Sequence, residues 1–314
     1  MTGGITIILP CYNKEELITM TIESLENQTI IKNKPANFVE ILCIDDCSKD
    51  NTYDILQHLA RKYGNIRVLR NEENSGVFAT RLYGIKESTK PYIAFMDPDD
   101  WADPTFYEEL YNAAIKTKAD ITQTPSVWKE YGRNLRTQAR TWYPNMPDGV
   151  YKMSVKTLEE LINRNWLTLW NRMFKRESLI KIAAYPPYYI NFIEDILIYI
   201  SAAVISKSVC NVRTQGFYHY NLSMEIDHLS RPKGKDKRAI PTAQVFQLLN
   251  SFLMESKNVK YYDAIVKYRG RYISNMAAVY SDCFNIEAFG NDDYRAAEIA
   301  YVRKLYVEMM KSLY

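Results

Sequence analysis

The chain has 314 residues and a formal net charge of +3 at pH 7. This length accommodates one large or two modest domains, and a nearly neutral charge gives no general basis for nucleic acid binding. The sequence has no apolar stretch long enough to span a bilayer and no signal-peptide pattern. Its 5 cysteines show no paired CxxC spacing, so we expect free thiols and a cytoplasmic protein.

Short apolar runs alternate with amphipathic segments through the N-terminal third of the chain. An apolar run bounded by turn residues predicts a buried strand, and the apolar spacing between the runs predicts helices. This alternation predicts an α/β fold in which a mostly parallel sheet is flanked by helices. The strands are expected at residues 5–9, 38–44, 66–69 and 92–96.

Three of these strands end in polar clusters: Pro10 to Asn13, Asp45-Asp46, and Asp97-Pro98-Asp99-Asp100. Right-handed crossovers bring the carboxyl ends of parallel strands to one edge of the sheet. Carboxylates there are hard oxygen ligands, which suit Mg²⁺ or Mn²⁺ and thus a phosphorylated ligand. The alternative for the last cluster is an acidic helix start, because Asp103-Pro104 resembles an N-cap.

The pattern becomes less regular after residue 118. We expect a strand at 119–124, and the irregular composition of 126–150 predicts a long loop, which in a compact domain is functional or mobile. Further on, Glu194-Asp195 directly precedes an apolar segment that predicts a buried helix. Two carboxylates at the start of a buried helix suit the helix dipole, and an N-capping role is the simplest account of them.

The absence of GxGxxG and GxxxxGK[ST] argues against a dinucleotide Rossmann site and excludes a P-loop. In their place, four blocks occur in order, and together they resemble the family 2 nucleotide-sugar glycosyltransferases of the GT-A fold. Proline inside the Asp-x-Asp motif departs from the small residue that is common there. The blocks are Ile7-Ile-Leu-Pro-Cys-Tyr-Asn-Lys-Glu15, Glu40-Ile-Leu-Cys-Ile-Asp-Asp-Cys-Ser-Lys-Asp-Asn-Thr52, Asn74-Ser-Gly with Arg81, and Phe95-Met-Asp-Pro-Asp-Asp100.

The resemblance implies a nucleotide-sugar donor, expected to be a UDP-sugar. Asp45 would accept a hydrogen bond from the uracil N3–H, since a carboxylate is a pure acceptor. Arg81 would face the base or the diphosphate with its fork of donors; its alternative is a solvated helix residue paired with an acid. The base and ribose pocket would be lined by Pro10, Tyr12, Asn13, Glu15 and Asn74.

The resemblance also implies a Mn²⁺ or Mg²⁺ ion. Asp99 would be a direct ligand, Asp97 would touch the metal or the ribose, and Pro98 lies between them. Asp100 would cap the turn or contact the donor sugar. A later polar loop would close over the diphosphate, with His228 on the metal and Arg231 on a phosphate, although a solvent-exposed His228 is the alternative and His219 is a second candidate.

On the acceptor side, the family's Glu-Asp motif implies Asp195 as the catalytic base, with Glu194 orienting it or binding the acceptor. The family segment with an aromatic, a polar and a basic residue matches Trp170, Asn171 and Arg172. Trp166 and Trp170 would stack on a sugar face; the alternative is that they are core residues. We place the loop at 126–150 beside this acceptor site.

The composition changes at residue 232, where a basic stretch begins. We therefore predict a catalytic domain at 1–232, with a nucleotide-binding half (1–118) and an acceptor-binding half (119–232), and a helical region at 233–314. The helices combine basic residues with tyrosines, which fits packing on the catalytic domain, self-association, or peripheral contact with anionic lipid at the inner face of the cell membrane.

The sequence thus predicts a metal-dependent, inverting glycosyltransferase that moves a sugar from a UDP-sugar to a hydroxyl group. Its acceptor would be a glycan, a lipid-linked glycan or a cell-wall polymer, and we expect no nucleic acid partner. Two alternatives are open at this point. One is a sugar nucleotidyltransferase, and the other is a non-catalytic scaffold that binds carbohydrate or membrane.

Overall fold

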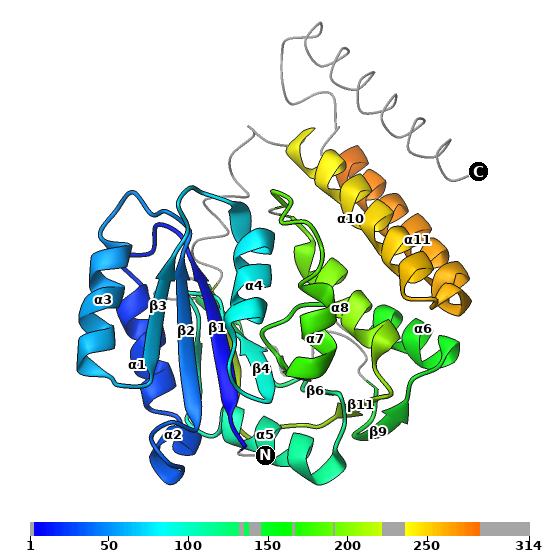
Figure 1. Ribbon diagram of the computed structural model, residues 1–314. Coiled ribbons are helices and arrows are strands. Elements are labelled where there is room, and N and C mark those ends of the chain that lie inside the picture. The colour runs from blue at the N-terminus through cyan, green and yellow to red at the C-terminus, as the bar shows by residue number, and fades with distance from the viewer. Residues whose placement is uncertain are drawn as a thin grey trace, which may run out of the picture. The chain divides into compact units, whose positions relative to one another are not determined.

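The computed structural model describes residues 3–131, 135–137, 146–164, 167–190, 192–221 and 236–282. Contacts within the chain divide it into two compact units, Met1–Ser230 and Arg231–Tyr314. The first unit contains the sheets that Figure 1 shows in blue to green, together with the helices that cover them. The division lies close to residue 232, where the composition of the sequence changes.

The main sheet confirms the predicted mostly parallel architecture. Its strands are β1 (Ile5–Cys11), β2 (Val39–Asp45), β3 (Ile66–Arg70), β4 (Tyr92–Phe95), β6 (Ile121–Gln123), β9 (Gly149–Lys152), β10 (Arg172–Lys175) and β11 (Ser208–Asn211). They lie in the order β3-β2-β1-β4-β10-β6-β11-β9. The first four strands of that order pair in parallel, whereas β10 and β9 run antiparallel to their neighbours.

Helices cover both faces of this sheet (Figure 1), and the alternation of side chains along β1 explains how. Ile5, Ile7 and Leu9 join the apolar cluster that includes side chains of α1, α3 and α5. Ile8 points the other way, toward α4, which in turn contacts α7 and α8. The helices of this unit are α1 (Ile18–Glu26), α2 (Thr29–Asn33), α3 (Thr52–Lys62), α4 (Gly76–Glu87), α5 (Phe106–Thr117), α6 (Val155–Arg164), α7 (Arg176–Ile182) and α8 (Glu194–Ile205).

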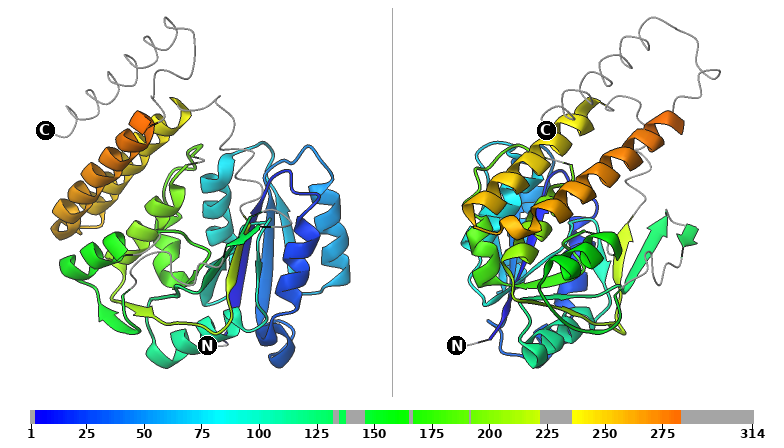
Figure 2. Two further views of the ribbon diagram at one scale, coloured as in Figure 1. Left: turned by 180° about the vertical axis from the view of Figure 1, so that it is seen from behind. Right: turned by 90° about the vertical axis from the view of Figure 1, so that its right-hand side faces the viewer.

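The prediction of an irregular region at 126–150 was wrong where the structure describes it. A smaller sheet in the order β5-β12-β7-β8 uses part of this region, and Figure 2 shows its strands apart from the main sheet. The pairing partners of these strands lie far away in the sequence. In the smaller sheet β7 pairs with β12, and in the main sheet β9 pairs with β11. The additional strands are β5 (Trp101–Ala102), β7 (Val127–Tyr131), β8 (Leu135–Thr137) and β12 (Tyr218–Asn221).

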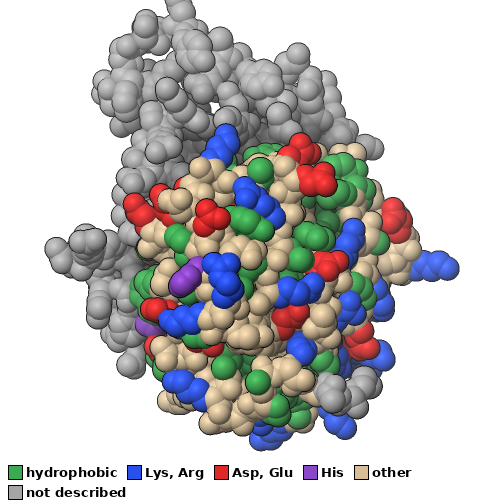
Figure 3. Space-filling view, turned by 60° about the vertical axis from the view of Figure 1, so that its left-hand side comes forward, with side chains coloured by type: hydrophobic (Ala, Val, Ile, Leu, Met, Phe, Trp, Pro, Cys, Tyr) green, Lys and Arg blue, Asp and Glu red, His purple; other side chains and the backbone are tan. Residues whose placement is uncertain are grey.

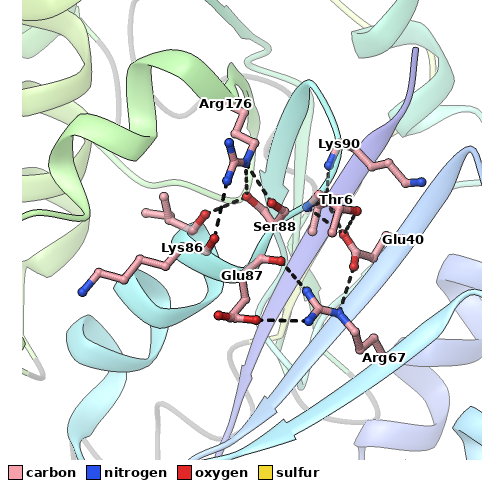
Figure 4. Close-up of polar contacts among 10 residues, drawn as sticks. Thr6, Glu40, Arg67, Lys86, Glu87, Ser88, Lys90 and Arg176 are labelled. Atoms are coloured by element: carbon pink, nitrogen blue, oxygen red, sulfur yellow. Dashed lines mark hydrogen bonds and ion pairs between the residues drawn. The ribbon is translucent and has the colours of Figure 1, made fainter. Parts of the chain in front are cut away.

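A polar cluster fastens β1, β2 and β3 to the chain that follows α4 (Figure 4). Glu40 accepts hydrogen bonds from the Thr6 hydroxyl at 2.6 Å, the Thr89 hydroxyl at 2.8 Å and Arg67 Nε at 3.0 Å. Burial raises the pKa of Glu40, but these hydrogen bonds outweigh it and leave the pKa below its ordinary value. The cluster lies toward the amino ends of β1 and β2, away from their polar carboxyl ends.

The second unit is helical in its described part, as the sequence predicted. Its elements are α10 (Asp236–Glu255), the 3₁₀ turn η1 (Val259–Tyr261) and α11 (Tyr262–Asp282). The helical pattern at 294–313 lies outside the described residues. Among the helices that the structure describes, none is long and apolar enough to cross a membrane. On the face shown in Figure 3, basic and acidic side chains are interspersed, as a net charge of +3 allows.

Candidate active site

Arg81 in α4 joins carboxylates from two distant parts of the chain. Its guanidinium donates to Glu194 at 2.6 Å, to Asp97 at 2.9 Å and to Asp195. The arginine is 3% exposed, and Asp195 lies 114 residues further along the sequence. The structure therefore brings together the Asp-x-Asp motif and the Glu-Asp motif, which the sequence could only propose separately.

The local backbone explains where these carboxylates lie. Asp97 follows β4 at the carboxyl edge of the sheet, and Glu194 and Asp195 form the first turn of α8. Ile193 precedes them with φ of +53°, a conformation that is rare for a β-branched residue. This left-handed residue turns the chain abruptly into the helix, so that both carboxylates face α4. Such strain is typical of functional sites.

The protonation of the cluster is set by burial and by repulsion. Burial raises the pKa of Asp195 to about 6; Arg81 lowers it in part, and Glu194 raises it. Burial likewise raises the pKa of Asp97 to about 6, with Arg81 opposing and Asp195 and Asp99 adding to the rise. One arginine therefore does not fully compensate the carboxylates that it holds. A carboxylate with a pKa near 6 suits general base catalysis near neutral pH.

Arg81 differs from its predicted role. We expected it to face the base or the diphosphate, but it forms ion pairs with three carboxylates of the protein itself. The physical reason is that α4 packs beside α8, which brings a negative cluster to the guanidinium. Arg81 is thus a positioning residue that holds the two acidic motifs together.

Asp99 pairs with a lysine that the sequence analysis did not select. Lys14 Nζ lies 2.5 Å from Asp99 Oδ2, and both side chains are largely buried. Lys14 lies in the first family block directly after Tyr12 and Asn13, but nothing in the local sequence indicated its partner. The second carboxylate of the Asp-x-Asp motif therefore already has a positive neighbour.

Asp100 is buried beneath the Asp-x-Asp motif. It is wholly buried and accepts hydrogen bonds from the Tyr218 hydroxyl at 2.6 Å and from the backbone N–H of Asn221 at 2.7 Å. The same hydroxyl accepts a hydrogen bond from the Asp97 backbone N–H. Asp100 therefore links β12 to the motif, which favours the structural alternative over contact with the donor sugar. Pro98 is buried beside it.

A pocket of about 210 Å³ lies at the carboxyl ends of β1 and β2. Its polar wall is Asp46, which accepts hydrogen bonds from Asn71 Nδ2, from Ser75 N and from Gly76 N at 2.7 to 2.9 Å. Gly76 has φ of +83°, a conformation that favours glycine. The lining residues are Pro10, Cys11, Tyr12, Asp46, Asn74, Gly76, Val77, Thr80 and Tyr189.

Asp46, and not the predicted Asp45, is among the residues that line the pocket. Asp45 ends β2 with its side chain wholly buried, accepting from Ser48 N and pairing with Arg70. Successive residues of a strand face opposite sides, so Asp45 turns away from α4 while Asp46 reaches the start of that helix. The sequence contained both aspartates, but only the position of α4 distinguishes them.

The other predicted donor residues fall into two groups. Pro10, Tyr12 and Asn74 line the pocket. Asn13 and Glu15 instead join neighbouring loops and are not among the lining residues. Asn13 Oδ1 accepts from Lys49 N at 2.9 Å, and Glu15 Oε2 accepts from Asn51 Nδ2 at 2.7 Å.

The predicted acceptor residues are core residues in the structure. Trp170 is 2% exposed and stacks between Tyr218 and Tyr220, with ring centroids 4.7 and 5.5 Å away. Arg172 is also buried, with its guanidinium 4.1 Å from the ring centroid of Tyr199. Asn171 donates to the Thr124 carbonyl at 2.7 Å. Trp170 packs on β12, Arg172 on Tyr199 of α8, and Asn171 on the Thr124 backbone. All three side chains are buried, so none is exposed to bind a sugar.

The histidine and loop predictions have a mixed outcome. His219 stacks on Trp101 and lies 2.9 Å from Asp103, so its described contacts belong to the smaller sheet. Trp166, His228 and Arg231 lie outside the described residues.

Comparison with known proteins decides the family. The model of glycosyl transferase family 2 matches residues 6–183, more than half of the chain. The chain belongs to this family. Arg81, Asp97 and Asp46 lie inside the matched range, and Asp195 lies 12 residues beyond its end. Membership of this family sets the sugar nucleotidyltransferase and scaffold alternatives aside.

Relatives with similar sequences are glycosyltransferases by name. The uncharacterized glycosyltransferase YibD of Escherichia coli K12 is 30% identical over 186 residues, covering 57% of this chain and 51% of that protein. The poly(ribitol-phosphate) beta-glucosyltransferase of Bacillus spizizenii is 30% identical over 228 residues, covering 72% of this chain and 33% of that protein. This family 2 glycosyltransferase therefore spans about half or less of these two relatives.

Solved structures confirm the GT-A type of fold. Residues 1–349 of S. aureus TarS in complex with UDP superpose with a TM-score of 0.63 at 18% identity, covering 86% of this chain and 72% of that one. The complex of the same segment with UDP-GlcNAc gives a TM-score of 0.60 at 16% identity, covering 84% and 80%.

Proposed function

We propose that this family 2 glycosyltransferase transfers a sugar from a UDP-sugar to a hydroxyl group of a glycan or glycan polymer, with inversion at the anomeric carbon. The observation that carries the proposal is the Arg81 cluster, which holds Asp97 and Asp195 at the same sheet edge as the pocket over Asp46. The pocket over Asp46 suits a nucleoside, and the Arg81 cluster suits proton transfer and charge compensation.

The assignment of uracil as the base depends on Asp46. Three N–H donors of the protein already bind this carboxylate, and a carboxylate has about four acceptor positions. The remaining position matches the imide N3–H of uracil. TarS, which shares the fold, is known in complexes with UDP and UDP-GlcNAc, and these agree with a uridine nucleotide here.

The proposed reaction is a single displacement. The oxygen of the acceptor hydroxyl attacks the anomeric carbon while its proton passes to a carboxylate oxygen of Asp195, and the bond from that carbon to the diphosphate oxygen breaks, releasing UDP. General base assistance of this kind typically contributes about 10²–10⁴-fold. Because the attack comes from the side opposite the leaving group, the anomeric configuration inverts. Arg81 keeps Asp195 in place and in its charged form.

The residues at the Asp-x-Asp motif fit a divalent cation, Mg²⁺ or Mn²⁺. Asp97 and Asp99 are hard oxygen donors, and the raised pKa of Asp97 reflects burial and nearby negative charge that Arg81 does not fully offset. Among the described residues no group of three potential ligands occurs, so donor oxygens and water would complete the coordination. The ion would stabilise negative charge on the departing diphosphate, and Lys14 would have to leave Asp99.

For the acceptor we propose a chemical class, a glycan or glycan polymer that offers a hydroxyl group. The name of the Bacillus spizizenii relative specifies a poly(ribitol-phosphate) polymer, which is consistent with a cell-wall or surface-glycan acceptor for this chain. A lipid-linked glycan presents the same hydroxyl chemistry. Contact of residues 233–314 with a membrane surface or with a second copy remains part of this proposal.

The test measures UDP release from a panel of nucleotide sugars with Mn²⁺, first without an acceptor, because transferases leak sugar to water. We expect turnover with a UDP-sugar that EDTA abolishes. Asp195→Asn should lower turnover by about 10²-fold or more while the Kd for UDP, measured by calorimetry, stays unchanged.

Three outcomes would contradict the proposal. If Asp195→Asn lost UDP binding and turnover together, Asp195 would act in donor binding and not as the base. If EDTA left turnover and UDP affinity unchanged, the cation assigned to Asp97 and Asp99 would be ruled out. A product with the anomeric configuration of the donor, seen by NMR, would exclude the single displacement.

A further inference from the structure

Tyr189 contributes an aromatic wall to the donor pocket from a distant part of the sequence. The rest of the pocket comes from the ends of β1 and β2 and from the start of α4, whereas Tyr189 precedes α8. Its side chain is 61% exposed, and that of Tyr12 on the same pocket is 37% exposed. Both aromatic rings lie at one pocket, so a ligand bound there would cover them.

The backbone that carries Tyr189 is anchored, although its side chain is exposed. The carbonyl of Ile190 accepts a hydrogen bond from Phe78 N in α4 at 3.3 Å. Phe78 also packs against Tyr185, with ring centroids 6.4 Å apart. The segment is thus held on the helix whose first turn forms the pocket, and the ring stays at the pocket without being buried in the core.

The chemistry of the pocket selects a flat heterocycle. Two tyrosine rings and the apolar side chains of Pro10 and Val77 offer stacking surfaces. The carboxylate of Asp46 is a hydrogen-bond acceptor on one wall of the pocket. The volume of 210 Å³ is below the roughly 300–1,000 Å³ of pockets that enclose a whole ligand. The pocket therefore fits the nucleoside end of a donor and leaves its diphosphate and sugar outside.

We propose that Tyr189 is a nucleobase-binding residue that stacks on the base of the donor together with Tyr12. The inference rests on the proposed function, because it takes the ligand to be a uridine nucleotide. It adds a binding residue outside the N-terminal blocks. It also means that the segment leading to Glu194 and Asp195 takes part in donor binding, so the donor pocket and the catalytic pair share one stretch of chain.

Calorimetry with UDP, uridine and inorganic diphosphate tests this assignment on the full chain. Tyr189→Ala should weaken the binding of UDP and uridine by about tenfold, as expected for the loss of one stacking partner of the base. Tyr189→Leu, which keeps an apolar side chain without a ring, should weaken both to a similar extent, and Tyr189→Phe should restore the affinity. Binding of inorganic diphosphate should not change in any of these variants.

Tyr188→Ala is the matched control, because Tyr188 is 39% exposed and does not line the pocket. It should leave the UDP affinity within about twofold of the wild type. Equal affinities for the Tyr189→Ala and Tyr188→Ala variants would overturn the inference while leaving the proposed function intact. Failure of the wild-type protein itself to bind UDP would instead overturn the proposed function.

Discussion

Single side chains in this site owe their charge to the surroundings that the fold gives them. Asp195 and Asp97 are ordinary aspartates in the sequence, yet burial raises the pKa of each to about 6. Arg81 limits this rise by lying between them. Asp99, in contrast, is paired with Lys14. The Asp-x-Asp motif thus contains two carboxylates in different electrostatic environments.

We predict that turnover of the UDP-sugar falls as the pH drops through about 6. The base has to be ionised to accept the proton, and Asp195 becomes protonated below its pKa of about 6. Asp97 titrates in the same range and interacts with Asp195, so the fall reports the pair. A pH profile of kcat/KM between 5 and 8.5 checks this, with thermal unfolding as a control for stability. A flat profile would contradict the base assignment.

We predict that Lys14→Met strengthens Mn²⁺ binding to the nucleotide-free protein by several-fold. The lysine competes with the cation for Asp99, and a partly exposed ion pair is worth up to about 1 kcal/mol. Paramagnetic resonance of free Mn²⁺ in a titration measures the affinity. Lys49→Met removes the same charge from an exposed side chain on a neighbouring loop and should change little. Weaker Mn²⁺ binding in Lys14→Met would rule out the competition.

At the scale of elements, α4 organises the site. Its first turn donates N–H groups to Asp46, and its middle supplies Arg81. The helix has to lie close to β1 and β2 for both contacts, and Gly84 permits this approach. A Cβ at Gly84 would lie 2.6 Å from Ile8 Cγ2 and 2.7 Å from Ile44 Cδ1.

We predict that Gly84→Ala destabilises the protein, although alanine normally favours a helix. The added methyl group would push α4 away from the sheet, and overpacking of this kind typically costs about 1–3 kcal/mol. Gly270→Ala in α11 is the matched control, since nothing lies within 4 Å of its Cβ position; it should not lower stability, because alanine is the better helix former. Thermal unfolding measures both, and an unchanged Gly84→Ala variant would contradict the close packing.

At the scale of the whole first unit, Arg81 joins parts of the chain that lie far apart in the sequence into one site. It links α4 with the end of β4 and the start of α8. Removing one partner of a buried charge cluster leaves the others uncompensated, which is strongly destabilising. The site and the fold therefore depend on the same guanidinium.

We predict that Arg81→Met lowers the free energy of unfolding by about 3–5 kcal/mol at pH 8 and by less at pH 5. At the lower pH, carboxylates with a pKa of about 6 are largely protonated, so less unpaired charge is buried. Arg61→Met, on the exposed surface of α3, should cost little at either pH. Chemical denaturation at both pH values checks this, and an equal loss at pH 8 and pH 5 would refute the charge argument.

The sequence by itself determined the alternation of strands and helices in the N-terminal third, the family blocks and the two acidic motifs, because these depend on periodicity and on residue types within short stretches. It did not determine which side chains meet. Asp46 instead of Asp45 lines the pocket because α4 lies on one face of β2. Trp170 stacks on tyrosines of β12 instead of facing a sugar. The partners of Arg81 and the place of Tyr189 were decided only by the tertiary structure, since packing between helices sets the direction of a side chain and brings together residues as far as 114 positions apart.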